Sequence, residues 1–276
     1  MTTERPDPCW ITPDWPAPPG VRALITSRAG GASLPPFAAA DGSGGMNLGF
    51  SEPDPAAARN RAALARWLPR DPCWLRQVHG AHVVDADHAL PGALPEGDAS
   101  VSARPGVVCC VLTADCLPVL LTDAQGRAVA AVHAGWRGLA AGVIQNTVRA
   151  LRAAAADPRA RVLAWLGPAI GPQRFEVGPE VRTAMRTLLP DADRAFAPGH
   201  GDRLLADIYA LARQALARED VADEDVQGGG LCTMSDARFY SYRRDGVTGR
   251  QAALIWIEDG RAGQLGADGY HSGRRT

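Results

Sequence analysis

The sequence contains no lysine, so all 29 of its basic residues are arginine. This absence excludes a lysine Schiff base and a phosphate-binding loop of the Walker type, because both need a lysine amine. A bound anion must therefore be held by arginine, by backbone N–H groups or by a metal ion. The formal net charge is only −1, which does not favour a protein that binds nucleic acid or a membrane surface.

Long hydrophobic runs are also missing. No apolar stretch approaches the ~18 residues that a membrane-spanning helix needs, and the first residues lack the apolar core of a signal peptide. We therefore expect a cytoplasmic protein. Its six cysteines include no Cys-x-x-Cys pair, and we expect them to be reduced thiols.

Histidine is scarce, with six residues in the chain. A multicopper oxidase needs about ten histidines for its copper centres, so the count argues against that class of enzyme. His79 and His133 each end an apolar run just before a glycine-containing turn, where functional sites are commonly built. The other four occupy polar or turn-like stretches, and we expect them to face solvent: His82, His88, His200 and His271.

The most informative stretch consists of two apolar segments joined by a short turn. Residues 119–122 and 127–132 flank a turn that contains glycine, and this pattern predicts a β-hairpin. With the turn centred between residues 124 and 125, antiparallel pairing places Cys116 opposite His133. A thiol beside an imidazole suits a soft metal site or an activated thiolate. A buried, inert thiol is the third possibility.

Adding His79 to this pair would give three protein ligands and an open fourth position, the arrangement of a catalytic zinc site. The competing interpretation is a Cys116 nucleophile with a histidine base. His79 lies 37 residues before Cys116, and spacing alone does not bring the two together.

The remaining patterns indicate an α+β fold with mixed or antiparallel sheets covered by helices, because helices and strands are mixed without regular βαβ order. We expect one domain over 1–276, with an extended segment over 1–20 and a flexible tail over 258–276. The predicted strands are 21–26, 73–79, 107–113, 119–122, 127–132, 161–166, 227–233 and 251–257. The predicted helices are 54–68, capped by Asp54, and 137–156, 178–189 and 203–218, and a long glycine-rich loop is predicted over 28–53.

Three further features have both a functional and a plain interpretation. Arg137 opens the predicted helix over 137–156, where backbone N–H groups and the helix dipole favour an anion; it is otherwise a surface arginine. The aromatic and arginine-rich run 240–246 could stack on a base or sugar, or form a solvated turn. Asp115 is expected to cap a turn.

A collinear series of motifs resembles one family, the YfiH family, also called laccase-like. Its members are described as purine nucleoside phosphorylases and, earlier, as multicopper polyphenol oxidases. The resemblance extends over about residues 21–257. The matching segments are Asn47-Leu48-Gly49, Asn60-Arg61, Gln77-Val78-His79-Gly80, Thr113–Pro118, His133–Gly138, Gly167–Pro172, Phe175–Gly178, Cys232-Thr233, Ser241–Asp245 and Thr248-Gly249-Arg250.

The resemblance implies a layered α/β sandwich related to a cysteine-hydrolase-like fold, with the metal or catalytic trio on His79, Cys116 and His133. It implies phosphorolysis of adenosine, inosine, guanosine and methylthioadenosine, and deamination of adenosine. Zinc is the expected cofactor and copper the alternative; zinc lowers the pKa of bound water to about 7, which suits deamination. The alternative functions are a Cys-His hydrolase that edits peptidoglycan precursors, a copper-dependent polyphenol oxidase, and a non-catalytic nucleoside-binding module.

The expected partners are purine nucleosides and phosphate, without nucleic acid or membrane, and the chain is expected to be a monomer or a weak homodimer. Because lysine is absent, arginine is expected to hold phosphate or ribose. The substrate-binding candidates are Asn47, Arg61, Gln77, Arg137 and Arg243. One segment departs from the family: a His-Val-Gly-Asp-like sequence usually follows Asn47-Leu48-Gly49, whereas this chain has Phe50-Ser51-Glu52, which puts the substrate contacts of that loop in question.

Overall fold

The structure is a computed structural model, and it describes residues 10–259. Its strands are β1 (Val21–Ile25), β2 (Ala29–Ser33), β3 (Val83–Asp85), β4 (Ala99–Ser102), β5 (Val108–Thr113), β6 (Leu117–Asp123), β7 (Val129–Ala134), β8 (Val162–Leu166), β9 (Glu176–Val177), β10 (Phe196–Pro198), β11 (Leu204–Ala206), β12 (Val226–Gly228) and β13 (Gln251–Ile257). Its helices are α1 (Ala57–Ala65), α2 (Trp136–Ala140), α3 (Val143–Ala154), α4 (Pro179–Arg186), α5 (Ile208–Ala217) and α6 (Tyr242–Asp245), with 3₁₀ turns η1 (Ala192–Ala195) and η2 (Asp223–Asp225).

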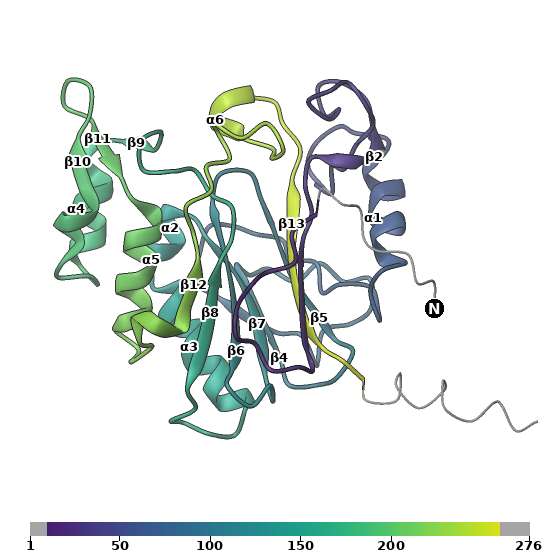
Figure 1. The fold of residues 1–276 in the computed structure, drawn as a ribbon, viewed down its shortest axis with the longest axis horizontal. Helices are drawn as coiled ribbons and strands as arrows, with labels where there is room; N and C mark the ends of the chain where they lie inside the picture. The colour runs from purple at the N-terminus through teal and green to yellow at the C-terminus, as the bar shows by residue number, and fades with distance from the viewer. Residues whose placement is uncertain (1–9, 260–276) are drawn as a thin grey trace, which may run out of the picture.

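Two β-sheets pack face to face in the centre of the molecule (Figure 1). The larger sheet has the order β12-β8-β6-β7-β4-β3 and mixes parallel with antiparallel pairs, while the smaller sheet, β1-β13-β5, is antiparallel. Helices α3 and α5 cover the outer face of the larger sheet, and α1 covers the outer face of the smaller one. The predicted layered α+β sandwich with mixed sheets is therefore confirmed.

Strand β6 shows why the central runs are continuously apolar. Val119 and Leu121 pack toward α3 and α5, whereas Leu120 packs between the two sheets, and all three are fully buried. Because side chains alternate between the two faces of a strand, a strand covered on both faces needs hydrophobic residues at every position. The apolar pattern therefore located β5, β6, β7 and β8 to within about two residues, but it missed β4, whose four buried residues include Ser100 and Ser102.

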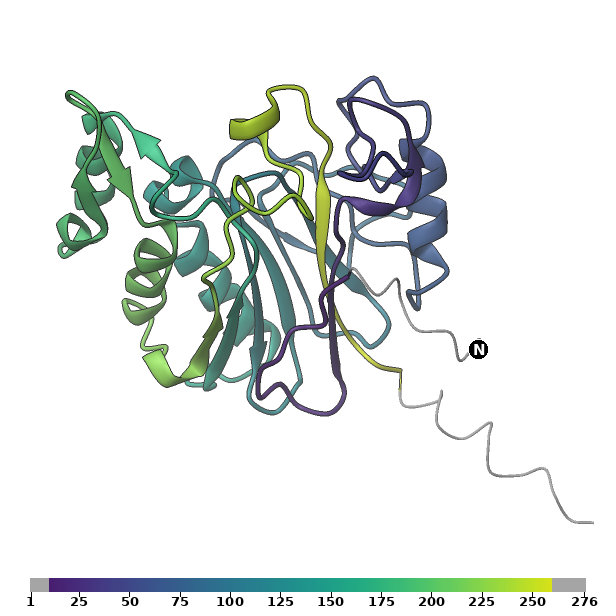
Figure 2. The same cartoon turned by 45° about the horizontal axis from the view of Figure 1, so that its top comes forward.

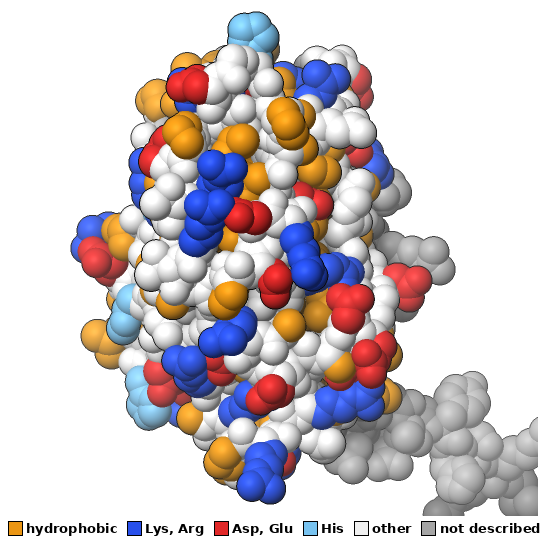
Figure 3. Space-filling model, turned by 90° about the vertical axis from the view of Figure 1, so that its left-hand side faces the viewer, with side chains coloured by type: hydrophobic (Ala, Val, Ile, Leu, Met, Phe, Trp, Pro, Cys, Tyr) orange, Lys and Arg blue, Asp and Glu red, His pale blue; other side chains and the backbone are white. Residues whose placement is uncertain are grey.

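The ends of the central strands lie beneath three peripheral units. A third small sheet, β10-β11-β9, lies with α4 at one side of the molecule, and α1 lies with β2 at the opposite side. The segment carrying α6 lies between these two units (Figure 2). On the side of α4 and α5, acidic and basic side chains are interspersed (Figure 3), as in the ion pairs Arg186–Asp193 and Arg213–Asp223.

Several predicted helix boundaries are wrong. The helix expected over 203–218 begins only at Ile208, because residues 204–206 form strand β11. The helix expected over 137–156 is interrupted at Gly142, whose φ of 86° is left-handed and separates α2 from α3; the apolar periodicity continues across the break, so the pattern did not reveal it. Asp54 does not cap α1, because the helix begins at Ala57 and the Asp54 carboxylate accepts the N–H of Ala56 before it.

Three further segments have a different secondary structure from the one predicted. Residues 73–79 form no strand and make only isolated bridges, Cys73 to Cys109 and Arg76 to Glu96. The predicted loop 28–53 contains β2, and the strand predicted over 227–233 ends at Gly228, where three successive glycines have positive φ.

The predicted tail 258–276 lies outside the described residues, apart from 258 and 259. Within 10–20, Ile11 forms a bridge to Ile25. The single-domain organisation stays a prediction. In the described part of the chain, no helix has the length and apolar character to cross a membrane.

Candidate active site and metal centre

The hairpin of β6 and β7 positions two of the three predicted site residues. The structure pairs Pro118 with His133 and Leu117 with Ala134, so the predicted pairing of Cys116 with His133 is wrong. The turn is centred one residue later than expected, because the buried Asp123 carboxylate accepts the N–H groups of Arg127 and Ala128 and draws that side of the turn inward.

Cys116 and His133 nevertheless lie on the same face of the hairpin. Cys116 precedes Pro118, the partner of His133, by two residues, and side chains two residues apart share one face of a strand. Both therefore lie on the side of the larger sheet that faces the smaller one. A shift of one residue in one strand would have separated them.

His79 is placed by a loop rather than by a strand end. Its φ of 61° is left-handed, which costs energy for a residue with a side chain. The carboxylate of Asp98 offsets this cost by accepting three successive N–H groups, from Val78 (3.2 Å), His79 (2.9 Å) and Gly80 (2.6 Å). Asp98 is fully buried just before β4.

Asp98 also orients His133. Its Oδ1 lies 2.8 Å from Nδ1 of the His133 ring, so Nε2 is the nitrogen left to face Cys116. One buried carboxylate therefore positions both histidines, as in sites where a carboxylate fixes the tautomer of a ligating imidazole. Sequence reasoning missed Asp98, because its only local signal is an acidic residue preceding a short buried strand.

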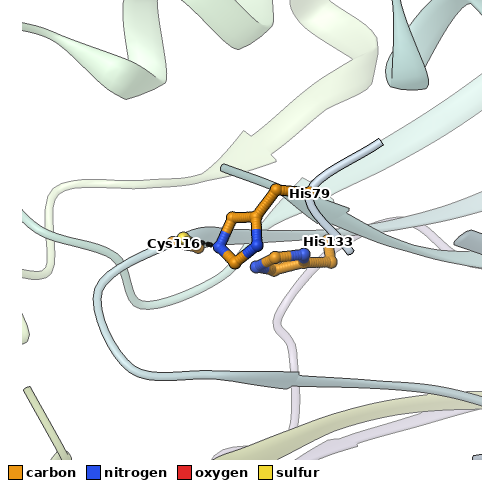
Figure 4. A group of neighbouring side chains, drawn as sticks. All are labelled: His79, Cys116 and His133. Atoms are coloured by element: carbon orange, nitrogen blue, oxygen red, sulfur yellow. Dashed lines mark hydrogen bonds between the residues drawn. The ribbon is translucent and has the colours of Figure 1, made fainter. Parts of the chain in front are cut away.

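The trio His79, Cys116 and His133 converges at this point (Figure 4). The Cys116 Sγ lies 3.9 Å from Nε2 of His79, and the two imidazole rings meet edge to face with their centroids 4.8 Å apart. Gly135 permits the approach, because a Cβ atom there would lie 2.9 Å from the Cys116 Sγ and 3.1 Å from the His79 ring.

The electrostatics favour a thiolate. Burial by itself raises the pKa of the Cys116 thiol, but the charge and hydrogen bonds of His133 and His79 outweigh it and lower the pKa to about 6. Burial likewise disfavours a charged His133, but the neighbouring thiolate and Asp98 raise the pKa of this imidazole to about 9. In the metal-free chain the two groups therefore favour each other's charged forms, a thiolate beside an imidazolium.

The donor set fits a metal ion. One atom from each residue of the trio lies within 4.8 Å of the other two, and tetrahedral zinc with sulfur and nitrogen ligands brings its donors to about 3.3–3.6 Å of one another. Small rotations of the three side chains would shorten the donor–donor distances to this spacing. His79 is exposed and Cys116 partly exposed, and all three residues line the cavity.

Asp115 ties several loops to the site instead of capping a turn. Its φ is 90°, its Oδ1 accepts the Thr233 hydroxyl (2.6 Å) and its Oδ2 accepts the N–H of Arg243 (2.6 Å). Its carbonyl accepts the N–H of Ile170. The motifs around residues 170, 233 and 243 are thereby attached to the residue next to Cys116.

A cavity of about 730 Å³ opens above the trio, whose three members all line it. Arg137 and Arg243 line the same cavity, and their guanidinium groups lie over the rings of Trp136 (4.5 Å) and Phe175 (5.6 Å). Arg137 does not begin a long helix, because α2 ends at Ala140. The helix-dipole argument therefore does not apply, but the guanidinium itself faces the cavity.

The other three substrate-binding candidates have structural partners. Gln77 lines the cavity, but its amide makes two hydrogen bonds with the backbone of Leu112. Asn47 is fully buried and bonds Asp54, Gly49 and Arg250, and Arg61 bonds the carbonyls of Leu48 and Gly49. Neither of these two is among the residues that line the cavity.

The remaining histidines behave as expected where the structure describes them. His82, His88 and His200 are exposed, and His271 lies outside the described residues. Within residues 10–259, the trio is the cluster of histidine, cysteine and acidic side chains that could hold a metal ion.

The chain matches a known family and several known proteins over most of its length. Residues 22–258 match the family described as multi-copper polyphenol oxidoreductase laccase. The chain is 51% identical over 254 residues to a purine nucleoside phosphorylase of Pseudomonas aeruginosa, covering 91% of this chain and 99% of that protein. It is 49% identical over 252 residues to purine nucleoside phosphorylase YfiH of Escherichia coli, covering 90% and 98%.

Solved structures show the same architecture. A Neisseria meningitidis protein superposes with a TM-score of 0.81 at 46% identity, covering 91% of this chain and 99% of that one. The Bacillus licheniformis protein YfiH superposes with a TM-score of 0.77 at 29% identity, covering 86% and 93%. With the collinear motifs and the convergent trio, these matches place the chain in the laccase-like family to which the YfiH proteins belong.

Proposed function

We propose that this protein is a metal-dependent purine nucleoside phosphorylase. The observation that carries the proposal is the convergence of His79, Cys116 and His133 at a cavity that Arg137 and Arg243 also line, the latter with one N–H group donated to the Glu176 carbonyl. The names of the relatives at 49–51% identity give the substrate class. Cytoplasmic localisation and a monomeric or weakly dimeric state stay predictions.

In this proposal the trio holds one zinc ion, which supplies Lewis-acid chemistry when bound. Arg137 and Arg243 hold phosphate against C1′ of the ribose. A phosphate oxygen forms the new bond to C1′, the C1′–N9 bond breaks, and the purine leaves with its electron pair and takes up a proton. Deamination of adenosine is a secondary activity of the same site.

Copper is the alternative metal, but a multicopper oxidase is not supported. Such an enzyme needs about ten histidines, the chain has six, and only two of those described belong to the metal-capable cluster. We therefore propose a single-metal site, despite the oxidase description attached to the family.

The proposal is tested by incubating adenosine, inosine and guanosine with the purified protein, with and without phosphate, and separating the products by chromatography. We expect free purine and ribose 1-phosphate only when phosphate is present, and some inosine from adenosine without it. Absence of any free base and any inosine under all conditions would refute the proposed function. Nucleoside binding by calorimetry without turnover would then indicate a non-catalytic binding module.

Arg137→Ala should weaken phosphate use much more than stability. The side chain is exposed and lines the cavity, so its removal should change the free energy of unfolding by no more than ~0.5 kcal/mol. A charge-assisted contact to phosphate contributes about 1.5–3 kcal/mol, so the KM for phosphate should rise about ten- to a hundredfold. Steady-state kinetics and thermal unfolding measure the two effects.

The control for this variant is Arg213→Ala. Arg213 lies on α5 and forms an ion pair with Asp223, and its removal should leave the KM for phosphate unchanged. If Arg137→Ala unfolds, the residue has a structural role. If neither quantity changes, the anion site lies elsewhere in the cavity.

A second candidate function is a thiol hydrolase, in the class that could edit peptidoglycan precursors. It is favoured by the relay of Asp98, His133 and Cys116, which orients a base beside a thiolate. Chelation separates the two candidates: metal-dependent phosphorolysis stops on removal of the metal, whereas a thiolate enzyme survives the chelator and is inactivated by iodoacetamide.

A further inference from the structure

The loop Gly49–Glu52 lies on the cavity wall and presents two side chains there, Phe50 and Glu52. We propose that this loop is the subsite that binds the purine base, with Phe50 stacking on the ring and Glu52 accepting hydrogen bonds from its edge. The inference rests on the proposed function for its ligand class and goes beyond it by predicting which purines are preferred.

Two neighbouring side chains hold the Phe50 ring in place. The residue is 44% exposed. The Arg61 guanidinium lies 4.0 Å from its ring centroid, and the Trp74 ring meets it edge-on at 5.6 Å. Arg61 is in turn fixed by the carbonyls of Leu48 and Gly49. The ring is thus supported by two neighbours, while its exposed part faces the cavity and can stack on a base.

Glu52 carries an unused acceptor. Its side chain is only 11% exposed, and its Oε1 is paired with Arg250 at 3.0 Å. Its Oε2 is buried and has no hydrogen-bond partner in the part of the chain that the structure describes. A Cβ atom at position 49 would collide with this oxygen, so Gly49 makes room for the carboxylate. A buried acceptor without a donor is costly, and Glu52 is among the residues that line the cavity, from which a ligand would supply the missing N–H group.

The chemistry of a carboxylate predicts which base fits. A carboxylate only accepts hydrogen bonds. Guanine offers two adjacent donors, N1–H and the 2-amino group, and hypoxanthine offers N1–H. Adenine offers its 6-amino group beside N1, whose lone pair repels a carboxylate oxygen. We therefore infer that Glu52 favours guanosine, then inosine, over adenosine.

The substitution Glu52→Gln tests the inference sharply. In this variant the amide oxygen keeps the N–H of Arg250, and the amide nitrogen takes the place of Oε2. Its N–H group donates to N1 of adenine but repels the N1–H group of guanine. Since a hydrogen bond to a charged group is worth about tenfold or more in binding, the ratio of kcat/KM for guanosine to that for adenosine should fall at least about tenfold. Phe50→Leu should raise the KM for all three nucleosides about tenfold and leave the KM for phosphate unchanged.

The matched control is Glu258→Gln, which removes the same charge from the exposed pair with Arg22 and should leave the guanosine-to-adenosine ratio unchanged. Binding of guanosine and adenosine, measured by calorimetry, gives the same ratio independently of turnover. If the proposed function fails, no variant releases free base, yet calorimetry still tests the subsite. An unchanged binding ratio in Glu52→Gln, together with unchanged nucleoside affinity in Phe50→Leu, would overturn the inference; Phe50→Leu decides if Glu52→Gln does not fold.

Discussion

Cys116→Ala should lose both the metal and the phosphorolysis. In the proposed site Cys116 supplies one of three protein ligands, and the neighbouring His133 and His79 lower the pKa of its thiol, which favours the anionic form that binds metal. Loss of Lewis-acid stabilisation worth several kcal/mol corresponds to a fall in kcat/KM of about a thousandfold or more. Metal analysis of the purified variant and a purine-release assay measure the two losses.

The control for Cys116→Ala is Cys232→Ala, which removes a partly exposed thiol that bonds the N–H of Gly171, outside the trio. It should retain the metal. Full metal retention in Cys116→Ala would show that the trio is not the metal site. Loss of activity with the metal retained would instead favour the thiol nucleophile.

Asp98→Ala should damage both metal affinity and folding. The substitution leaves the N–H groups of residues 78–80 without their acceptor and His133 without its orienting carboxylate. Buried donors without partners cost about 1–3 kcal/mol each, so the free energy of unfolding of the metal-free protein should fall by about 3 kcal/mol or more. Loss of an orienting partner weakens metal affinity about ten- to a hundredfold.

Urea unfolding of the metal-free protein and zinc competition against a chelator measure these effects. The matched control is Asp85→Ala, which removes a carboxylate bonded to the exposed imidazole of His88 at 2.8 Å and should change neither quantity strongly. Asp98→Asn keeps the size of the side chain and should restore part of the stability. Wild-type zinc affinity in Asp98→Ala would show that Asp98 supports the loop without positioning the ligands.

In the metal-free chain, the pair formed by Asp98 and His133 also makes the stability depend on pH. The pKa of Asp98 is lowered: burial opposes ionisation, but His133 and the N–H groups of Gly80 and Val78 outweigh it. A group whose pKa is lowered on folding stabilises the protein at pH values above its unfolded pKa. That contribution is lost as the pH falls through the folded pKa. Asp98→Ala should therefore destabilise the protein more at neutral pH than under acidic conditions.

The sequence predicted the core better than the periphery. Strands buried on both faces, such as β5, β6 and β8, are continuous apolar runs and were located within a residue or two. The short strands β3, β9 and β10 have two or three residues each and depend on distant partners. Local patterns do not mark such elements, because tertiary contacts decide them.

The trio illustrates what pattern reasoning contributes to a site and what it misses. The hairpin pattern placed Cys116 and His133 on one face even though their pairing was misassigned, because an error of two residues preserves the alternation of side chains. The convergence of His79 with them follows from Asp98, which binds backbone groups 18–20 residues earlier in the chain and a ring 35 residues later. Nothing local to residue 98 signals those contacts. The Glu52 oxygen that has no hydrogen-bond partner among residues 10–259 became visible only in the fold.

The most direct test is to strip the metal from the protein and titrate zinc back while inosine phosphorolysis is measured in excess phosphate. If the trio holds one metal that the reaction requires, the stripped protein releases no hypoxanthine. Activity then rises linearly to a plateau at about one zinc per chain, with a parallel copper titration testing the alternative metal. Full activity in the stripped protein, or zinc bound at one per chain with no phosphorolysis, would contradict the account.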